Sequence, residues 1–205
     1  MPSESLQCFS PVSRVFGVDR GTPIYHYYTK QFVSPYIPHI HGSVLQVGKE
    51  TLLPHLGQPP VLLTEVERFL PETFDWIICS DFLQGVYDVF FAMRTLHRIL
   101  KPQGTLLSTF PGILHQNHTD SRKDYWRFTR SSVRELLTQV FEPQHIEIGY
   151  VGNLLVALAL LHGLAAEELQ QEELDHLDPD YEVFITSKAV KAERNRTVRY
   201  EFSAY

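Results

Sequence analysis

The sequence is poor in cysteine and in positive charge. Its 205 residues include only Cys8 and Cys79. Two cysteines are too few for a disulfide framework, which indicates a reducing compartment. The 18 Lys and Arg residues face 24 Asp and Glu residues, for a formal net charge of −6. A non-specific nucleic-acid binder normally has the opposite balance. These shortages exclude a disulfide-stapled scaffold and argue against a nucleic-acid partner.

Long apolar runs are also missing. The most apolar stretch, residues 151–166, is interrupted by Asn153, His162 and Gly163. It is shorter than the roughly 20 apolar residues that a membrane span needs. The first ten residues have neither the basic nor the apolar region of a signal peptide. We therefore expect a cytoplasmic protein with no membrane span, in which residues 151–166 form a buried helix.

The composition is that of a folded protein of one domain. Hydrophobic residues make up 43% of the chain and charged residues 20%, outside the range of disordered chains. A chain of this length can bury a sizeable core without metal or disulfides. We expect an N-terminal arm over residues 1–19, loosely attached, then one domain over 20–190. Residues 191–205 form a basic tail, which is either a solvated end or a contact for an anionic partner.

Apolar segments with strand and helix character alternate along the chain. Helical spacing predicts helices over residues 25–33, 88–100, 130–140 and 154–164, with a helical pattern continuing over 165–174. Short apolar runs predict strands over residues 43–48, 60–66, 74–80, 105–109, 146–150 and 181–187. This order indicates an α/β domain with a mostly parallel sheet and an antiparallel edge. Ligands bind such sheets beyond the carboxyl ends of the strands, so we expect the chemistry in the loops after Gly48, Ser80 and Thr109.

Three segments carry a family resemblance: VLQVG at 44–48, FDWIICSDFLQGVYD at 74–88 and LHRILKPQGTLLSTFPG at 96–112. Together they resemble the class I S-adenosylmethionine-dependent methyltransferases, which implies a Rossmann-like fold and S-adenosylmethionine as cofactor. The segment DYWRFTRSSVREL at 124–136 is similar to a subgroup of small bacterial methyltransferases often associated with glycosyltransferases. That subgroup implies methyl transfer to an oxygen of a sugar or glycan intermediate in polysaccharide biosynthesis.

The sequence departs from the family in its cofactor region. Gln46 stands where the first motif usually has an acid, and Gly48 is the one motif glycine that remains. Too few residues separate Gly48 from Phe74 for the usual helices and second strand, so this strand is lacking or shortened. The resulting alternative is a non-catalytic protein that has lost cofactor binding. It would serve as a binding or scaffolding subunit, with a protein partner or as a homodimer.

The resemblance assigns residues to the cofactor. They lie in the first motif, near the expected adenine and after the central strand: Gln46, Gly48, Glu65, Asp81, Phe82 and Leu83. Each has a structural alternative. Gly48 serves equally well as an ordinary turn glycine, since a lone glycine after a strand is weak support for a cofactor loop. Asp81 could cap a helix, and Leu83 could be a core residue.

The loop after Thr109 supplies the expected catalytic and substrate residues. Methyl transfer to a hydroxyl needs a general base, and His115 or His118 suits that role near neutral pH. The alternatives are a solvated loop, or a metal site formed by both histidines with Asp120. The segment after it would bind the acceptor through Asp124, Tyr125, Trp126 and Arg127. Its structural alternative is an Asp124–Arg127 ion pair that fixes the loop while the aromatic rings pack in the core.

Overall fold

A single five-stranded sheet organises the described part of the chain. The computed structural model describes residues 10–48, 52, 60, 61, 63–80, 82–115 and 123–193. The strands are β1 (Val44–Val47), β2 (Phe74–Cys79), β3 (Leu100–Pro111), β4 (Ile146–Val151) and β5 (Phe184–Val190). Their order across the sheet is β1-β2-β3-β5-β4. The β1–β2 and β2–β3 pairs are parallel, and β5 is antiparallel to both of its neighbours. The mostly parallel sheet with an antiparallel edge is therefore confirmed.

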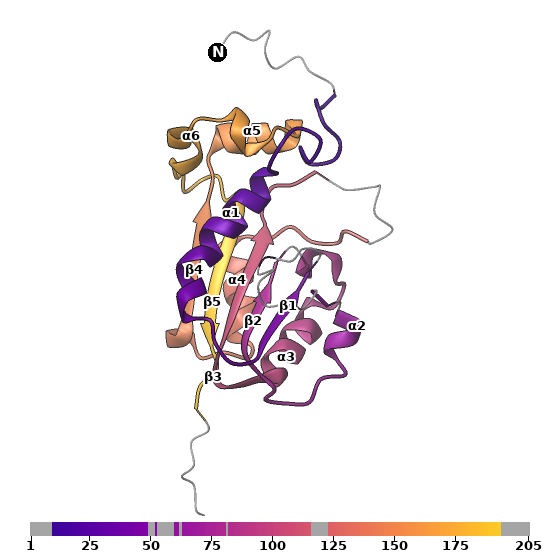
Figure 1. Ribbon diagram of the computed structural model, residues 1–205, viewed down its shortest axis with the longest axis vertical. Helices are drawn as coiled ribbons and strands as arrows, with labels where there is room; N and C mark the ends of the chain where they lie inside the picture. Colours follow the sequence, from indigo (N-terminus) through magenta and orange to yellow (C-terminus); the bar gives the residue numbers. More distant parts are fainter. Residues whose placement is uncertain are drawn as a thin grey trace, which may run out of the picture.

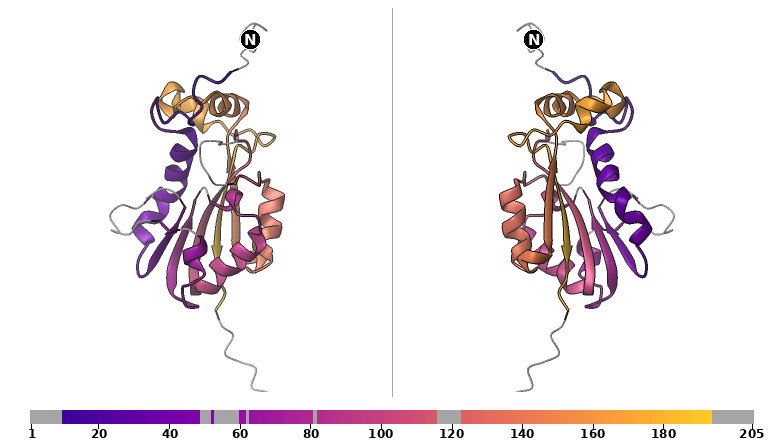
Figure 2. Two further views of the ribbon diagram at one scale, coloured as in Figure 1. Left: turned by 90° about the vertical axis from the view of Figure 1, so that its right-hand side faces the viewer. Right: turned by 90° about the vertical axis from the view of Figure 1, so that its left-hand side faces the viewer.

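Helices cover both faces of the sheet (Figures 1 and 2). On one face lie α3 (Val89–Ile99) and α4 (Arg130–Thr138), and α1 (Ile24–Val33) lies on the other. Helices α5 (Leu154–His162) and α6 (Gln171–Asp175) lie beyond the end toward which β3 runs (Figure 1). The main core fills the space between the sheet and the α3–α4 layer. Both faces are thus covered, as the apolar strands require.

The helix boundaries follow from caps in the sequence. The Asp88 side chain accepts a hydrogen bond from the Phe91 amide at the start of α3, and Thr129 and Ser132 form a capping box at the start of α4. Helix α5 begins at the Asn153 cap and ends at Gly163, which has a left-handed backbone. Short 3₁₀ helices cover η2 (Ser34–His39), η4 (Leu83–Gly85), η5 (Pro143–His145) and η6 (Ala166–Glu168).

The strand predicted over residues 60–66 is wrong. Of the residues described in this range, only Val61 pairs with the sheet, through one parallel bridge to Val47, and residues Leu63–Val66 form the short helix α2. The physical reason is the burial of Val66, which is fully enclosed in the main core. The chain must leave the sheet edge after one bridge to bring Val66 there. Among the described residues, β1 is therefore flanked by this single bridge in place of a second strand.

The described part of the N-terminal arm is packed, not loosely attached as expected. The amides of Val12 and Ser13 donate to the carbonyl of His162 at the end of α5, and Ser13 is buried. At the other end of the domain, Lys191 donates to the carbonyls of His97 and Leu100. Across the described ranges, no helix has the length and apolarity of a membrane span.

An ion pair joins the starts of β1 and β2 to the start of β3. The Asp75 carboxylate accepts from Lys101 Nζ at 2.7 Å and from the Ser43 amide and hydroxyl, both at 2.8 Å. Partial burial acts to raise the pKa of Asp75, but these hydrogen bonds outweigh it and lower the pKa to about 2. Because the folded-state pKa lies below the unfolded value of about 3.9, this stabilisation is present above pH ~4 and is lost toward pH ~2.

We predict that Asp75→Asn lowers the free energy of unfolding at neutral pH by about 1 kcal/mol, because the pair is one-third exposed and screened by solvent. The variant also shows a smaller fall in stability between pH ~4 and ~2 than the wild type does, because the contribution of Asp75 is gone. Denaturant unfolding across this pH range measures both effects. Glu135→Gln, at an exposed position of α4, is the matched control and retains the contribution of Asp75. An Asp75→Asn profile that parallels the wild type would contradict the assignment.

Candidate functional site

The parallel strands β1 and β2 end side by side. Val47 pairs with Cys79, and the Ser80 amide continues the ladder by donating to the Val47 carbonyl at 3.1 Å. Gly48 follows β1 with φ +147°, and a Cβ at this position would lie 2.4 Å from the Ser80 carbonyl oxygen. A side chain does not fit here, so Gly48 permits the close approach of the two strand ends. It is more than an ordinary turn glycine.

The other predicted cofactor residues lie at different depths. Gln46 is buried within β1 at 5% exposure, and Phe82 and Leu83 are buried members of the main core. The burial of Leu83 favours a packing role for that side chain. Glu65 is exposed on α2, whereas Asp81 lies outside the described residues. Of the six, Gln46 and Gly48 lie at the end of β1, and Phe82 and Leu83 follow β2.

An arginine fork fixes the segment between β3 and α4. Arg127 forms a two-pronged ion pair with Asp124, at 2.6 and 2.8 Å. Its Nε donates to the Leu114 carbonyl at 3.1 Å, and its Nη2 lies 3.4 Å from the His115 carbonyl oxygen. A planar guanidinium can make these bonds at once. Asp124 and Arg127 therefore hold the segment in place, as the structural alternative predicts.

His115 lies beneath the N-terminal segment. Its imidazole stacks on the Phe16 ring, with the ring centroids 4.0 Å apart and the planes at 13°. Phe16 has φ +60°, an uncommon conformation for a bulky residue. His118 and Asp120 lie outside the described residues. Within the described ranges, no group of three or more His, Cys, Asp or Glu residues is placed to hold a metal.

Three aromatic side chains form an exposed cluster after β2 and before α4. We call Tyr87, Tyr125 and Trp126 the aromatic shelf; their side chains are 72%, 41% and 39% exposed. The Tyr87 ring lies 5.3 Å from that of Tyr125 and 6.5 Å from that of Trp126. Trp126 Nε1 donates to the carbonyls of Val86 and Tyr87, which fixes the indole ring. Tyr125 and Trp126 therefore do not pack in the core, against the structural alternative for the aromatic rings.

Tyr87 is a shelf residue that the sequence prediction missed. It belongs to the quoted segment 74–88, but it precedes a helix cap and carries no pattern of its own. The amides of Tyr125 and Trp126 both bond to the Gln84 carbonyl, at 2.8 and 3.2 Å. This tie between two loops distant in sequence brings Tyr87 to the shelf. The sequence signal that could have identified Tyr87 is its place in the loop that follows the carboxyl end of a predicted strand, where ligands bind.

Comparison with known proteins identifies the architecture. The sequence model of a methyltransferase domain matches residues 42–108, the span from β1 into β3. A methyltransferase of Archaeoglobus fulgidus superposes with a TM-score of 0.53 at 13% identity, over 80% of this chain and 94% of the other. A Thermotoga maritima methyltransferase, described as a possible histamine N-methyltransferase, gives 0.56 at 15% identity, over 82% and 91%. The chain has the fold of the class I methyltransferases.

A further comparison limits what this fold implies. A Haemonchus contortus phosphoethanolamine N-methyltransferase, solved with S-adenosylhomocysteine and phosphomonomethylethanolamine, superposes with a TM-score of 0.52 at 16% identity. The match covers 82% of this chain and 53% of that one, so this chain spans about half of its length. A search of curated proteins found no match. Structural similarity at such low sequence identity establishes the fold but does not identify the substrate.

We predict that Gly48→Ala destabilises the protein by about 1–3 kcal/mol, since the added methyl meets the Ser80 carbonyl and the backbone is strained. Denaturant unfolding measures the loss. Gly85→Ala is the matched control, because the nearest atom to its added Cβ is 3.2 Å away, and its cost is smaller. Equal stability of Gly48→Ala and the wild type would show that the close approach of β1 and β2 is not needed.

Proposed function

We propose that this protein is an S-adenosylmethionine-dependent methyltransferase. The observation that carries the proposal is the match of the methyltransferase domain to residues 42–108. That span supplies β1, β2 and the connection into β3, whose ends lie at one edge of the sheet. Open α/β sheets bind ligands at this edge. The fold shared with two methyltransferases over at least 80% of the chain supports the same function.

The residues at the ends of β1 and β2 suit the cofactor in two respects. The backbone there can approach a ligand closely, and apolar side chains are available to its apolar part. Gly48, which has no side chain, permits the close approach of the strand ends. Gln46, with a buried amide side chain, precedes this point in β1, and Phe82 follows β2. A glutamine can hydrogen-bond the methionine part of the ligand, but it cannot offset a positive charge. When bound, S-adenosylmethionine supplies an activated methyl group. These residues would hold it, with Asp81 and Glu65 as further candidates.

The acceptor proposed here is an oxygen of a sugar or glycan intermediate. The aromatic shelf offers fixed ring faces at the edge of the sheet where the transfer would occur, and aromatic faces suit the apolar side of a sugar ring. Asp124 and Arg127 position the shelf through their ion pair. His115, or His118 in the same loop, is the proposed base. It would take the proton of the acceptor hydroxyl while the methyl group passes from the cofactor sulfur to that oxygen, which would leave S-adenosylhomocysteine.

A second candidate function is a non-catalytic methyltransferase fold that acts as a binding or scaffolding subunit. Two observations favour it. Among the residues that the structure describes, one bridge at Val61 stands where a full strand would extend the cofactor site beyond β1. The position of the usual acid is held by Gln46, which is buried and uncharged. Cofactor binding separates the two candidates.

We predict that calorimetric titration with S-adenosylmethionine and S-adenosylhomocysteine gives saturable binding, with dissociation constants below the millimolar range. Gln46→Glu should tighten binding about tenfold, because a carboxylate can pair with the ammonium of the methionine part. Gln31→Glu adds the same charge on the exposed side of α1 and is the matched control, with no effect expected. Absence of heat at millimolar ligand would exclude the enzyme and favour the scaffolding protein.

We predict that His115→Ala lowers turnover about 10²–10⁴-fold with an oxygen acceptor, whereas Tyr125→Ala mainly raises KM for the sugar. Formation of S-adenosylhomocysteine against a panel of neutral glycosides measures both effects, with cofactor affinity checked by calorimetry. Phe90→Ala, also an exposed aromatic position, is the control and leaves both constants unchanged. If His115→Ala and His118→Ala each turn over at the wild-type rate, neither histidine is the base. If Tyr125→Ala has the wild-type KM, the aromatic shelf does not bind the acceptor.

A further inference from the structure

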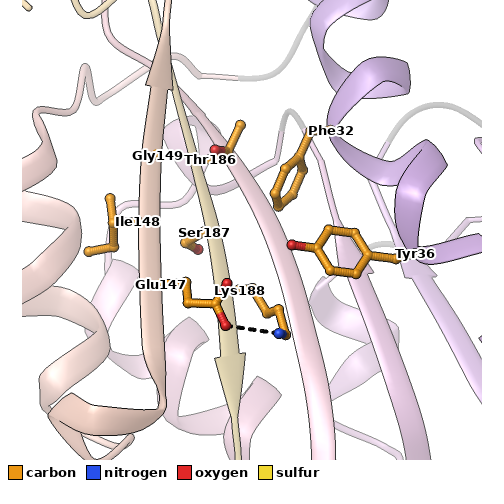
Figure 3. Close-up of a pocket in the computed structure, with 8 residues that line it drawn as sticks. All are labelled: Phe32, Tyr36, Glu147, Ile148, Gly149, Thr186, Ser187 and Lys188. Atoms are coloured by element: carbon orange, nitrogen blue, oxygen red, sulfur yellow. Dashed lines mark hydrogen bonds and ion pairs between the residues drawn. The ribbon is translucent and has the colours of Figure 1, made fainter. Parts of the chain in front are cut away.

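A concave site lies away from the edge of the sheet where methyl transfer is proposed. A hollow of about 280 Å³ separates the lower end of α1 and η2 from strands β4 and β5 (Figure 3). We call it the β4–β5 hollow. Phe32 and Tyr36 form one wall, and Glu147, Gly149, Thr186 and Lys188 form the opposite side. The strands that carry it are the antiparallel pair, whereas the proposed transfer site follows β1, β2 and β3.

The space depends on a glycine within a regular strand. Gly149 pairs with Thr186 in a register that runs without interruption from Ile146 to Val151. A Cβ at this position would lie 2.8 Å from the Thr186 hydroxyl oxygen. Glycine weakens the interior of a strand, and where no bulge explains it, it marks a place where a ligand or another backbone approaches closely. Here it leaves the Thr186 side of the hollow open.

The charged groups of the hollow neutralise each other. Glu147 and Lys188 stand directly opposite across β4 and β5, and Lys188 Nζ donates to Glu147 Oε1 at 2.9 Å. This bond raises the pKa of Lys188, so the ammonium persists at neutral pH. The same ammonium lies 5.7 Å from the centroid of the Tyr36 ring. The hollow therefore presents donors and acceptors side by side without a net charge.

An aromatic wall faces these polar groups. The Phe32 and Tyr36 rings meet edge to face, with centroids 5.7 Å apart, and both are half-buried. Figure 3 shows the two rings on the helical side and the Glu147–Lys188 pair across from them. One apolar wall with a few fixed polar groups opposite is the usual composition of a small-molecule site. The volume of about 280 Å³ lies just below the usual range of such sites, about 300–1,000 Å³, so the occupant is one small ring.

We propose that the β4–β5 hollow binds a single neutral sugar ring. The apolar face of such a ring packs on Phe32 and Tyr36. Its hydroxyls both donate and accept, so they can bond to Glu147, Lys188 and Thr186 while the ion pair stays intact. A charged ligand is disfavoured, because an anion meets Glu147 and a cation meets Lys188. This site is independent of methyl transfer and of the aromatic shelf.

Titration of the isotope-labelled full chain with methyl α-D-glucopyranoside and other neutral methyl glycosides tests the proposal. We expect saturable shifts of the amide resonances of Gly149, Thr186 and Lys188, with a millimolar dissociation constant. Tyr36→Ala removes part of the aromatic wall and should weaken binding about tenfold. Tyr87→Ala changes the aromatic shelf instead and is the matched control, with these shifts unaffected.

Gly149→Ala is a second variant that narrows the hollow while retaining both rings and the ion pair. It should also weaken binding, and thermal unfolding checks that the variant is folded. The proposal is overturned if no methyl glycoside gives saturable shifts at these residues, or if Tyr36→Ala and folded Gly149→Ala bind as the wild type does. It is equally overturned if inorganic phosphate or glycine binds the hollow more tightly than the methyl glycosides do. Shifts confined to Tyr125 and Trp126 would overturn it and support the acceptor site instead.

Discussion

The parallel alignment of β1, β2 and β3 is the constraint on which the site depends. From Gly104 to Pro111, β3 is buried without interruption, so its backbone groups have no access to water and must be paired on both sides. Val47 aligns with Cys79, and Cys79 aligns with Ser108. The loops that follow β1, β2 and β3 consequently leave the sheet at the same edge. Gly48 then permits contact at the point where an ordinary residue would force the ends apart.

The segment before α4 shows how one short run of residues serves two purposes. Asp124 and Arg127 bond to each other and to the backbone beyond β3, while Tyr125 and Trp126 between them are exposed. The charges of Asp124 and Arg127 are paired with each other, so the two aromatic rings are the groups available to a ligand. The two alternatives set out for this segment are therefore not exclusive. The charged pair has the structural role, and the aromatic pair remains available for recognition.

The antiparallel side of the sheet has a different character. There, α1 and η2 stand against β4 and β5, and the surface combines rings with a neutral ion pair. The carboxyl edge of β1–β3 is instead built from glycine, buried strand ends and a fixed loop. The two regions lie on different strands, so the fold has room for a site at the edge and another on the face that α1 covers.

The sequence by itself determined the α/β class, the starts of α3 and α4 to within one residue, and the position of most strands, because apolar periodicity acts locally. It also located Gly48 and the segment from Asp124 to Arg127. It failed over residues 60–66, where local strand propensity lost to the burial of Val66. Only the tertiary structure decided the position of Phe16 over His115, the addition of Tyr87 to the shelf, and the β4–β5 hollow. Each of these joins residues distant along the chain, and such contacts depend on how the layers pack.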